Sequence, residues 1–241
     1  MAWLRDMRAG TGVLPTYPPP AFVERALDLI FPPVCVGCRR VGRWICQRCW
    51  QDAPWTIGQI CGHCGRRSVT SLCPSCAGSH AALDSLLAVA RFEGVGREAV
   101  HALKFHDRHA ISGMMGRLMA RAAEGVEADV VVPVPLHRRR LRERGYDQGA
   151  MLAQSAARAL ERPYLPTLER MRPTRQQAAL DAAARQANVA GAFRAKQPLE
   201  GSAVLLVDDV STTGATLNAA AEALKDAGAG QITGLVFAWA E

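Results

Sequence analysis

The 241-residue sequence predicts an α/β protein: a parallel β-sheet flanked by helices and preceded by a small cysteine-rich module. Two observations predict this class. From residue 81 onward, short apolar runs rich in β-branched residues alternate with segments whose apolar residues recur at helical spacing. Before that point, all eight cysteines fall between Cys35 and Cys76. The chain is long enough for one sizeable domain and a small appendage.

The N-terminal part is predicted to be a loose tail over residues 1–21, followed by a short amphipathic helix within residues 22–33. The tail has no apolar core ahead of a small-residue cleavage site, so it does not read as a secretory signal. No apolar run is long enough to cross a membrane. We therefore expect a cytoplasmic protein. Its formal net charge of +7 indicates a mild preference for anionic partners.

Residues 34–80 are predicted to form a double zinc ribbon. Every cysteine belongs to a C-x-x-C pair, and two such pairs supply the four thiolates of a tetrahedral zinc site. Two structural zinc ions are therefore expected. Disulfides and redox-active pairs are the alternatives, but the chain has no secretion signal and no cysteine after Cys76. The ligands would be Cys35, Cys38, Cys46, Cys49, Cys61, Cys64, Cys73 and Cys76.

The spacing of the pairs favours sequential sites, one from the first four cysteines and one from the last four. A crossed pairing is possible, and His63 or His80 could replace a ligand, although the cysteines already complete both sites. So short a segment, with few apolar residues, cannot fold on hydrophobic burial alone. Metal binding should therefore supply its stability.

The predicted α/β domain spans residues 81–241. Its expected strands are 86–92, 129–134, 204–207 and 232–239. Its expected helices are 94–105, 111–123, 147–160 and a final one whose apolar positions run from Leu217 to Ala227.

The most informative segment is 204–216. A buried strand, Val204–Val207, leads to the adjacent acids Asp208 and Asp209, and a hydroxyl-rich turn around Gly214 then opens a helix. Free N–H groups and the positive dipole end make such a turn suitable for phosphate, while carboxylates accept from sugar hydroxyls. In an ordinary strand–turn–helix, Asp209 or Ser211 would merely cap the helix. Two uncompensated acids at a buried strand end are costly, which favours a sugar-phosphate site.

This segment resembles the signature of type I phosphoribosyltransferases, which bind phosphoribosyl pyrophosphate. The resemblance implies that Asp208 and Asp209 hold the ribose hydroxyls, and that Mg²⁺ bridges diphosphate and sugar oxygens. No Gly-Lys-Ser/Thr follows the strand, so the turn is not a Walker loop. The 5′-phosphate would be held by Ser211, Thr212, Thr213, Gly214 and Thr216.

A second candidate locus follows the strand at 129–134. A proline-stiffened loop leads into a run of arginines, whose guanidinium groups can bind a diphosphate in bidentate fashion. The same pattern also occurs in a solvated basic helix and in a nucleic-acid-binding patch. The candidate residues are Pro135, Leu136, His137, Arg138, Arg139, Arg140 and Arg144.

Several short segments of the sequence resemble those of the ComF family of competence-associated proteins. They are PVPLHRRRLRERGYDQ at 133–148, RQQAAL at 175–180, LKF at 103–105 and LDLIFPPVC at 27–35. The resemblance covers roughly residues 27–241. It implies a double zinc ribbon joined to a type I phosphoribosyltransferase-like domain. It also implies a link to DNA uptake and natural transformation, or to nucleotide metabolism, with DNA-uptake proteins as candidate partners.

Whether the chain is a phosphoribosyltransferase is left open by the sequence, and no catalytic residue is assigned. Thr212 stands where 6-oxopurine enzymes carry an acid and cannot serve as that base, which disfavours hypoxanthine–guanine salvage. The acceptor side could involve 175–177 or, as better candidates, Arg144, Tyr146 and Gln148. Histidines are available as acid–base groups but are typical of a surface: His101, His106, His109 and His137.

The alternative is a non-catalytic protein that binds single-stranded DNA through the zinc ribbons and the cluster Arg138–Arg144. Such binding should depend strongly on salt, because it neutralises phosphates. Trp44, Trp50 and Trp55 could stack on bases, or they could cover an otherwise thin core. A pure scaffold for a DNA-uptake helicase is implied by the resemblance alone.

Overall fold

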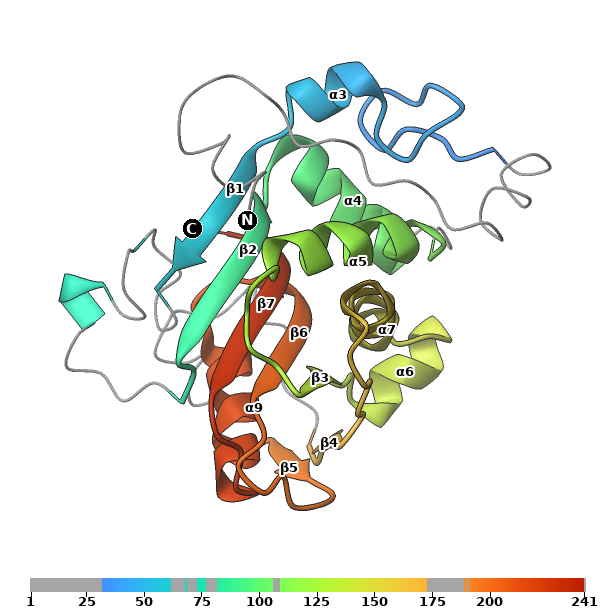
Figure 1. The fold of residues 1–241 in the computed structure, drawn as a ribbon. Helices are drawn as coiled ribbons and strands as arrows, with labels where there is room; N and C mark the ends of the chain where they lie inside the picture. The colour runs from blue at the N-terminus through green and yellow to red at the C-terminus, as the bar shows by residue number, and fades with distance from the viewer. Residues whose placement is uncertain are drawn as a thin grey trace.

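A computed structural model describes residues 32–61, 68, 73–76, 82–105, 109–172, 189 and 191–240. Its main sheet has five strands in the order β1-β2-β7-β6-β3, and all neighbours run parallel except β1, which is antiparallel to β2 (Figure 1). The predicted α/β class with a parallel sheet is confirmed. The strands are β1 (Trp55–Ile60), β2 (Ser85–Arg91), β3 (Val130–Pro133), β6 (Val204–Ser211) and β7 (Ile232–Trp239).

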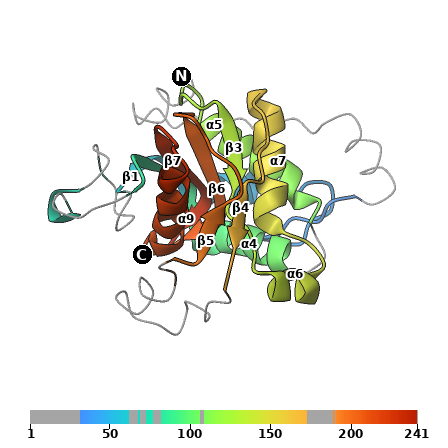
Figure 2. The same cartoon turned by 90° about the horizontal axis from the view of Figure 1, so that it is seen from below.

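Helices cover both faces of this sheet (Figure 2). One face carries α4 (Gly94–Phe105), α5 (Ile111–Ala122) and α7 (Gln148–Leu160), whose apolar residues form one core cluster with the sheet. The other face carries α9 (Ala215–Asp226) and a second cluster. Every residue of β7 is buried, because this strand lies between β2 and β6 in the sheet and helices cover the sheet on both faces.

Helices α5 and α7 pack at very close range. A Cβ atom placed on Gly116 of α5 would lie 2.3 Å from Cβ of Ser155 on α7. The Ser155 hydroxyl donates to the carbonyl of Gly113 at 3.1 Å and ties the two helices together. Only glycine at 116 permits this approach without a shift of one helix.

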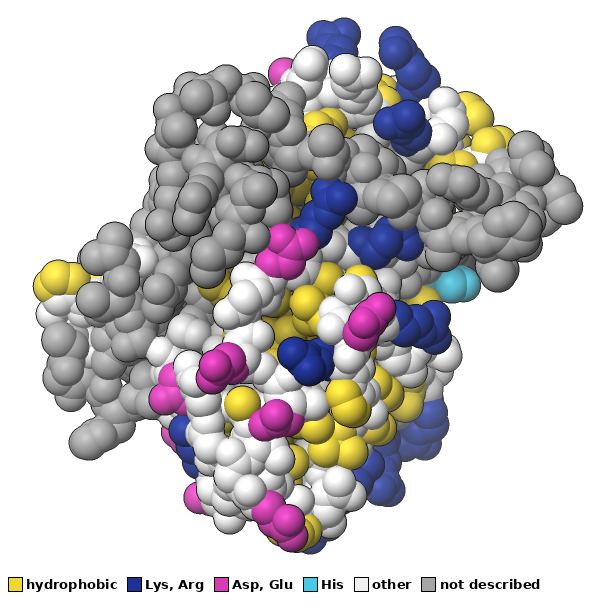
Figure 3. All heavy atoms as spheres, viewed as in Figure 1, with side chains coloured by type: hydrophobic (Ala, Val, Ile, Leu, Met, Phe, Trp, Pro, Cys, Tyr) yellow, Lys and Arg dark blue, Asp and Glu magenta, His cyan; other side chains and the backbone are white. Residues whose placement is uncertain are grey.

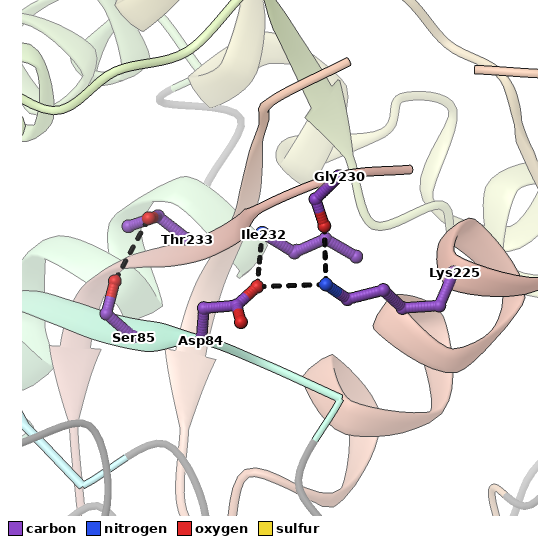
Figure 4. A network of polar contacts seen from close by, with 6 residues as sticks. All are labelled: Asp84, Ser85, Lys225, Gly230, Ile232 and Thr233. Carbon is purple, nitrogen blue, oxygen red and sulfur yellow. Dashed lines mark hydrogen bonds and ion pairs between the residues drawn. The ribbon is translucent and has the colours of Figure 1, made fainter. Parts of the chain in front are cut away.

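A polar network fixes the amino ends of β2 and β7 (Figure 4). Oδ2 of Asp84 accepts from the backbone N–H of Ile232 at 2.7 Å and from Nζ of Lys225 at 3.1 Å. Lys225 also donates to the carbonyl of Gly230. The hydroxyls of Ser85 and Thr233 lie 3.0 Å apart, across the first residue pair of the β2–β7 ladder. These contacts set the register of two strands that are far apart in sequence.

Strand β6 is longer than expected. The apolar run ends at Val207, but the strand continues through Ser211 because its ladder with β7 continues to the pair of Ser211 with Trp239. Asp208 and Asp209 are therefore strand residues, whereas we expected them where the strand leaves the sheet. The structure also contains a short antiparallel pair of strands that was not predicted from the sequence, β4 (Leu168–Arg170) and β5 (Phe193–Ala195).

The first cysteine group packs directly on the α/β domain. It contains α3 (Gln47–Gln51), which lies next to α4 (Figure 1). Val36, Ile45 and Trp50 belong to the same core cluster as the buried residues of α4. Beyond α3 the chain forms β1, which joins the outer edge of β2, and later the short 3-10 turn η1 (Pro74–Cys76). The predicted tail and residues 22–31 of the predicted helical segment 22–33 lie outside the described residues.

In the part of the chain that the structure describes, no helix is both long enough and apolar enough to cross a membrane.

Candidate functional site

The parallel strands bring the two candidate loci to one edge of the sheet. Strands β3 and β6 are adjacent, and the backbone N–H of Val134 extends their ladder by donating to the carbonyl of Val207 at 2.9 Å. The loop Pro135–His137 therefore begins beside the point where Asp208 and Asp209 follow Val207. The crevice at the carboxyl ends of such strands is the usual ligand site of parallel α/β sheets.

The two acids are in different environments because successive strand residues point to opposite faces. Asp209 is 4% exposed and lies on the α4 side, where its Oδ1 is 2.7 Å from Nζ of Lys104. Its other oxygen, Oδ2, is buried and has no hydrogen-bond partner among the described residues. Oδ1 of Asp208 accepts from the backbone N–H of Asp209 at 2.8 Å. Burial raises the pKa of Asp208 well above its usual range, and the carboxylate of Asp209 raises it further.

Two cations from distant segments complete the surroundings of the acids. Lys104 is the penultimate residue of α4, and Arg170 ends β4. Both lower the pKa of Asp208 and so oppose the effect of burial. The guanidinium of Arg170 lies over the ring of Phe193, 5.2 Å from its centroid. Neither cation was among the site residues predicted from the sequence.

The turn after β6 carries the hydroxyl groups expected of a phosphate site. Gly214 has φ +73°, a left-handed conformation that suits glycine, and is the N-cap residue of α9. Oγ of Ser211 and Oγ1 of Thr213 are buried and have no hydrogen-bond partner within the described chain. Buried hydroxyls are normally paired, so these two and Oδ2 of Asp209 fit a polar ligand held at the turn.

The basic locus divides into an outer and an inner part. Arg138–Arg144 form a helix, α6, whose N-terminus is capped by Nδ1 of His137, which accepts from the backbone N–H of Arg139 at 3.2 Å. Arg138 and Arg139 are exposed and pair with Glu169 and Glu143. Lys and Arg side chains gather along the edge where α6 lies (Figures 1 and 3).

Arg140 is the inner member of this locus. It is partly buried, and its charge lowers the pKa of Arg170, although burial of Arg170 is the larger cause. Arg170 thus lies close enough to Asp208 for its charge to act on that acid, and Arg140 lies close enough to act on Arg170. Asp147 orients the loop before α6: its Oδ2 accepts from the backbone N–H of Leu136 at 2.9 Å, and its Oδ1 caps α7.

Contacts from the last residue of α6 and from the segment after it hold the C-terminal end of α4. The hydroxyl of Tyr146 donates to the carbonyl of Leu103 at 2.5 Å. The guanidinium of Arg144 lies over the exposed ring of Phe105, 5.5 Å from its centroid, and donates to Oε1 of Gln148 at 2.5 Å. The words LKF and RGYDQ, distant in the sequence, thus meet in space.

The first four cysteines form one group. Cys35, Cys38, Cys46 and Cys49 have sulfur atoms within 4.8 Å of one another, and Sγ of Cys35 accepts from the backbone N–H of Cys46 at 3.3 Å. Burial and the neighbouring thiols raise the pKa of Cys49, a cost that a metal cation would relieve. The donors fit a tetrahedral zinc ion, as the sequential pairing predicts.

The second cysteine group is described in part. Cys61, Cys73 and Cys76 are buried together within the same distance. Cys64, the fourth predicted ligand, lies outside the described residues.

Comparisons with known proteins support both predicted parts of the chain, the double zinc ribbon and the α/β domain. Residues 26–77 match the model of the double zinc ribbon domain, and residues 147–239 match that of the phosphoribosyl transferase domain. The DNA utilization protein YhgH of Salmonella typhimurium is 33% identical over 211 residues, which cover 78% of this chain and 92% of that protein. Competence protein F of Haemophilus influenzae is 28% identical over 200 residues, 78% of this chain and 85% of the relative. The chain belongs to the ComF family. Competence protein ComFC of Bacillus subtilis is 29% identical, over 76% of this chain and 79% of its own length.

The ComF resemblance found in the sequence is thereby confirmed, and the structure adds detail at several predicted residues. Trp50 is buried and its ring centroid lies 4.4 Å from that of Trp55, so these rings cover the core of the first ribbon. His101 lies between the rings of Phe92 and Phe105. His106 and the segment 175–177 lie outside the described residues.

Lys104 and Arg170 were missed because nothing local marks them as site residues. Lys104 stands in the word LKF, which the sequence presented only as part of a resemblance. Arg170 ends the stretch PTLER at 166–170, which has no apolar pattern that would suggest a strand. Only the fold brings these residues to the acid pair.

Proposed function

We propose that the chain binds phosphoribosyl pyrophosphate, or a related sugar phosphate, together with Mg²⁺ at the turn between β6 and α9. Three buried oxygens at the end of β6 and in the turn that follows it carry the proposal: Oδ2 of Asp209, Oγ of Ser211 and Oγ1 of Thr213, which have no partner among the described residues. Leaving buried polar atoms unpaired costs about 1–3 kcal/mol each, so three of them within five residues, just before the start of α9, support a ligand that satisfies them.

Each part of the site has a role in this proposal. Asp208 and Asp209 would accept hydrogen bonds from the ribose hydroxyls, and the hydroxyls and backbone N–H groups of Ser211–Thr216 would hold the 5′-phosphate. Arg140 and Arg170, beside the loop Pro135–His137, would face the diphosphate. Mg²⁺ would neutralise charge between the diphosphate and the sugar oxygens.

In phosphoribosyl transfer, a nucleophile replaces pyrophosphate at the anomeric carbon. The transition state should carry oxocarbenium-like charge, so the placement of charged groups matters more than a protein nucleophile. The proposed arrangement would meet that requirement, with the carboxylates of Asp208 and Asp209 facing the sugar and the guanidinium groups facing the diphosphate. Its relatives carry the names DNA utilization protein and competence protein. We accordingly propose a role for this chain in the cytoplasmic handling of incoming DNA or its nucleotides.

Calorimetric titration with phosphoribosyl pyrophosphate tests the proposal. The wild type should bind in the presence of Mg²⁺, and the Asp208→Asn/Asp209→Asn variant should not, because both acceptors of the sugar hydroxyls lose their charge. Asp226→Asn, which changes an exposed acid at the end of α9, is the matched control and should bind like the wild type. Absence of binding by the wild type would refute the proposal.

The exposed side of α6 supports a second candidate function, the binding of single-stranded DNA. Arg138, Arg139 and Arg142 are exposed there and present a basic surface. Changing Arg138, Arg139 and Arg140 to Ala should lower the affinity for single-stranded DNA and reduce its dependence on salt. An unchanged affinity would exclude α6 as the contact. Trp50 and Trp55 do not supply the stacking surface in this scheme, because they pack on each other.

A further inference from the structure

Lys104 forms the closest ion pair with the predicted sugar-binding acids. Its Nζ lies 2.7 Å from Oδ1 of Asp209, and the exposed fractions of the two side chains are 23% and 5%. The pair joins the end of α4 to the end of β6, two elements that belong to the same core cluster. Since Oδ2 of Asp209 has no partner in the described chain, Lys104 satisfies half of this carboxylate and leaves the other half open.

The position of Lys104 is built by other parts of the fold. The residue before it, Leu103, is buried, and its carbonyl accepts from the hydroxyl of Tyr146. The residue after it, Phe105, lies under the guanidinium of Arg144. One contact from the last residue of α6 and one from the segment after it therefore hold the end of α4 on either side of Lys104. An ordinary surface lysine would not need this support.

Charge explains why a lysine is needed at this point. Asp208 and Asp209 are adjacent and largely removed from solvent, and this pair attracts a cation strongly, because Asp209 carries a charge and an approaching cation favours the ionised form of Asp208 as well. A divalent ion could occupy them before any sugar phosphate arrives. An ammonium group on Asp209 prevents this, and its flexible four-carbon stem allows it to move when a better partner for the carboxylate appears.

We propose that Lys104 is a built-in counter-ion that holds the acid pair in the ligand-free protein and passes to the ligand's diphosphate when the ribose hydroxyls take over Asp209. The part concerning the ligand rests on the proposed function, and the part concerning the free acid pair does not. In this scheme the site accepts a divalent cation only together with the phosphate-bearing ligand, because Lys104 leaves Asp209 only when an anion offers it a new partner.

Mn²⁺, followed by electron paramagnetic resonance, is a suitable probe for zinc-loaded protein. Without ligand, Lys104→Met should bind Mn²⁺ about tenfold or more tightly than the wild type, since one charge-assisted contact no longer competes. Lys104→Arg should exclude Mn²⁺ like the wild type. Lys225→Met is the matched control. Lys225 also pairs with an acid, Asp84, but this pair lies at the amino ends of the strands, away from the site. The Asp208→Asn/Asp209→Asn variant gives the background.

Binding of phosphoribosyl pyrophosphate with Mg²⁺ supplies the second readout. Lys104→Met should weaken it about tenfold or more, and Lys104→Arg should restore most of the affinity. If Mn²⁺ binding is the same in Lys104→Met and the wild type, the inference is overturned; Lys104→Gln gives the same decision if the Met variant does not fold. If Lys104→Met gains Mn²⁺ while the wild type fails to bind phosphoribosyl pyrophosphate, the proposed function fails and the counter-ion role stands.

Discussion

Asp208→Asn should make the ligand-free protein more stable at neutral pH. Burial and the carboxylate of Asp209 raise the pKa of Asp208 to about 8, against an ordinary value near 3.8. Between these values the folded state keeps a proton that the unfolded chain has released. The stability of the wild type therefore falls as pH rises through this window, by at most about 1.4 kcal/mol per pH unit, and levels off above it.

Asn keeps the shape of the side chain and its acceptor for the N–H of Asp209, but it does not titrate. The difference in unfolding free energy between Asp208→Asn and the wild type should therefore grow with pH, by at most about 2 kcal/mol between pH 6 and pH 7.5. Urea unfolding of zinc-loaded protein in phosphate-free buffer measures this difference. Asp226→Asn corrects for the change in net charge, because Asp226 is exposed.

Parallel pH dependences for the wild type and Asp208→Asn would refute the reasoning, because they would mean that Asp208 ionises as easily in the folded state as in the unfolded chain. If Asp208→Asn is more stable than the wild type but no longer binds the sugar phosphate, the Asp208 carboxyl group lowers stability and serves ligand binding. Its charge would then be kept for the ligand at the expense of stability, as is common for binding sites.

Three further predictions concern the core and the zinc sites. Gly116→Ala should destabilise the protein by about 1 kcal/mol in urea unfolding, because the clash with Ser155 costs about 1–3 kcal/mol and helix propensity returns about 1; a stabilised variant would contradict the close packing. Cys46→Ser should lower the zinc content from two ions to one per chain by elemental analysis, and an unchanged content would exclude Cys46 as a ligand. Trp50→Ala should cost about 3–5 kcal/mol, because its buried ring joins the first ribbon to the core; a loss below about 1 kcal/mol would mean that the two pack independently.

The sequence predicts best those elements that have a clear period. The helix expected at 94–105 and the strand expected at 232–239 have the same bounds in the structure. The strand 55–60 was not expected, because its residues lie among the cysteine pairs and pair with β2 only in the folded chain. The polar end of β6 was missed for a similar reason: Asp208 to Ser211 have no apolar pattern, and the ladder with β7 keeps them in the sheet.

The part of the candidate site that is one continuous segment could be predicted from the sequence. The part that folding assembles from separate segments could not. The residue types from Asp208 to Thr216 are sufficient to indicate a sugar-phosphate site. Lys104 and Arg170 come from different segments, and their approach to the acids depends on how α4 and β4 pack. The division of the arginines on α6 into an exposed group and the inward Arg140 likewise follows from the position of that helix beside β4.

Strand β1 has a consequence for any attempt to dissect the chain. It covers the outer edge of β2, and the first cysteine group shares its core with α4. A shortened chain beginning at residue 82 would leave the N–H and C=O groups of β2 open to pairing with another molecule. We expect such a fragment to self-associate. If so, the cysteine-rich segment protects the α/β domain from aggregation, whatever else it binds.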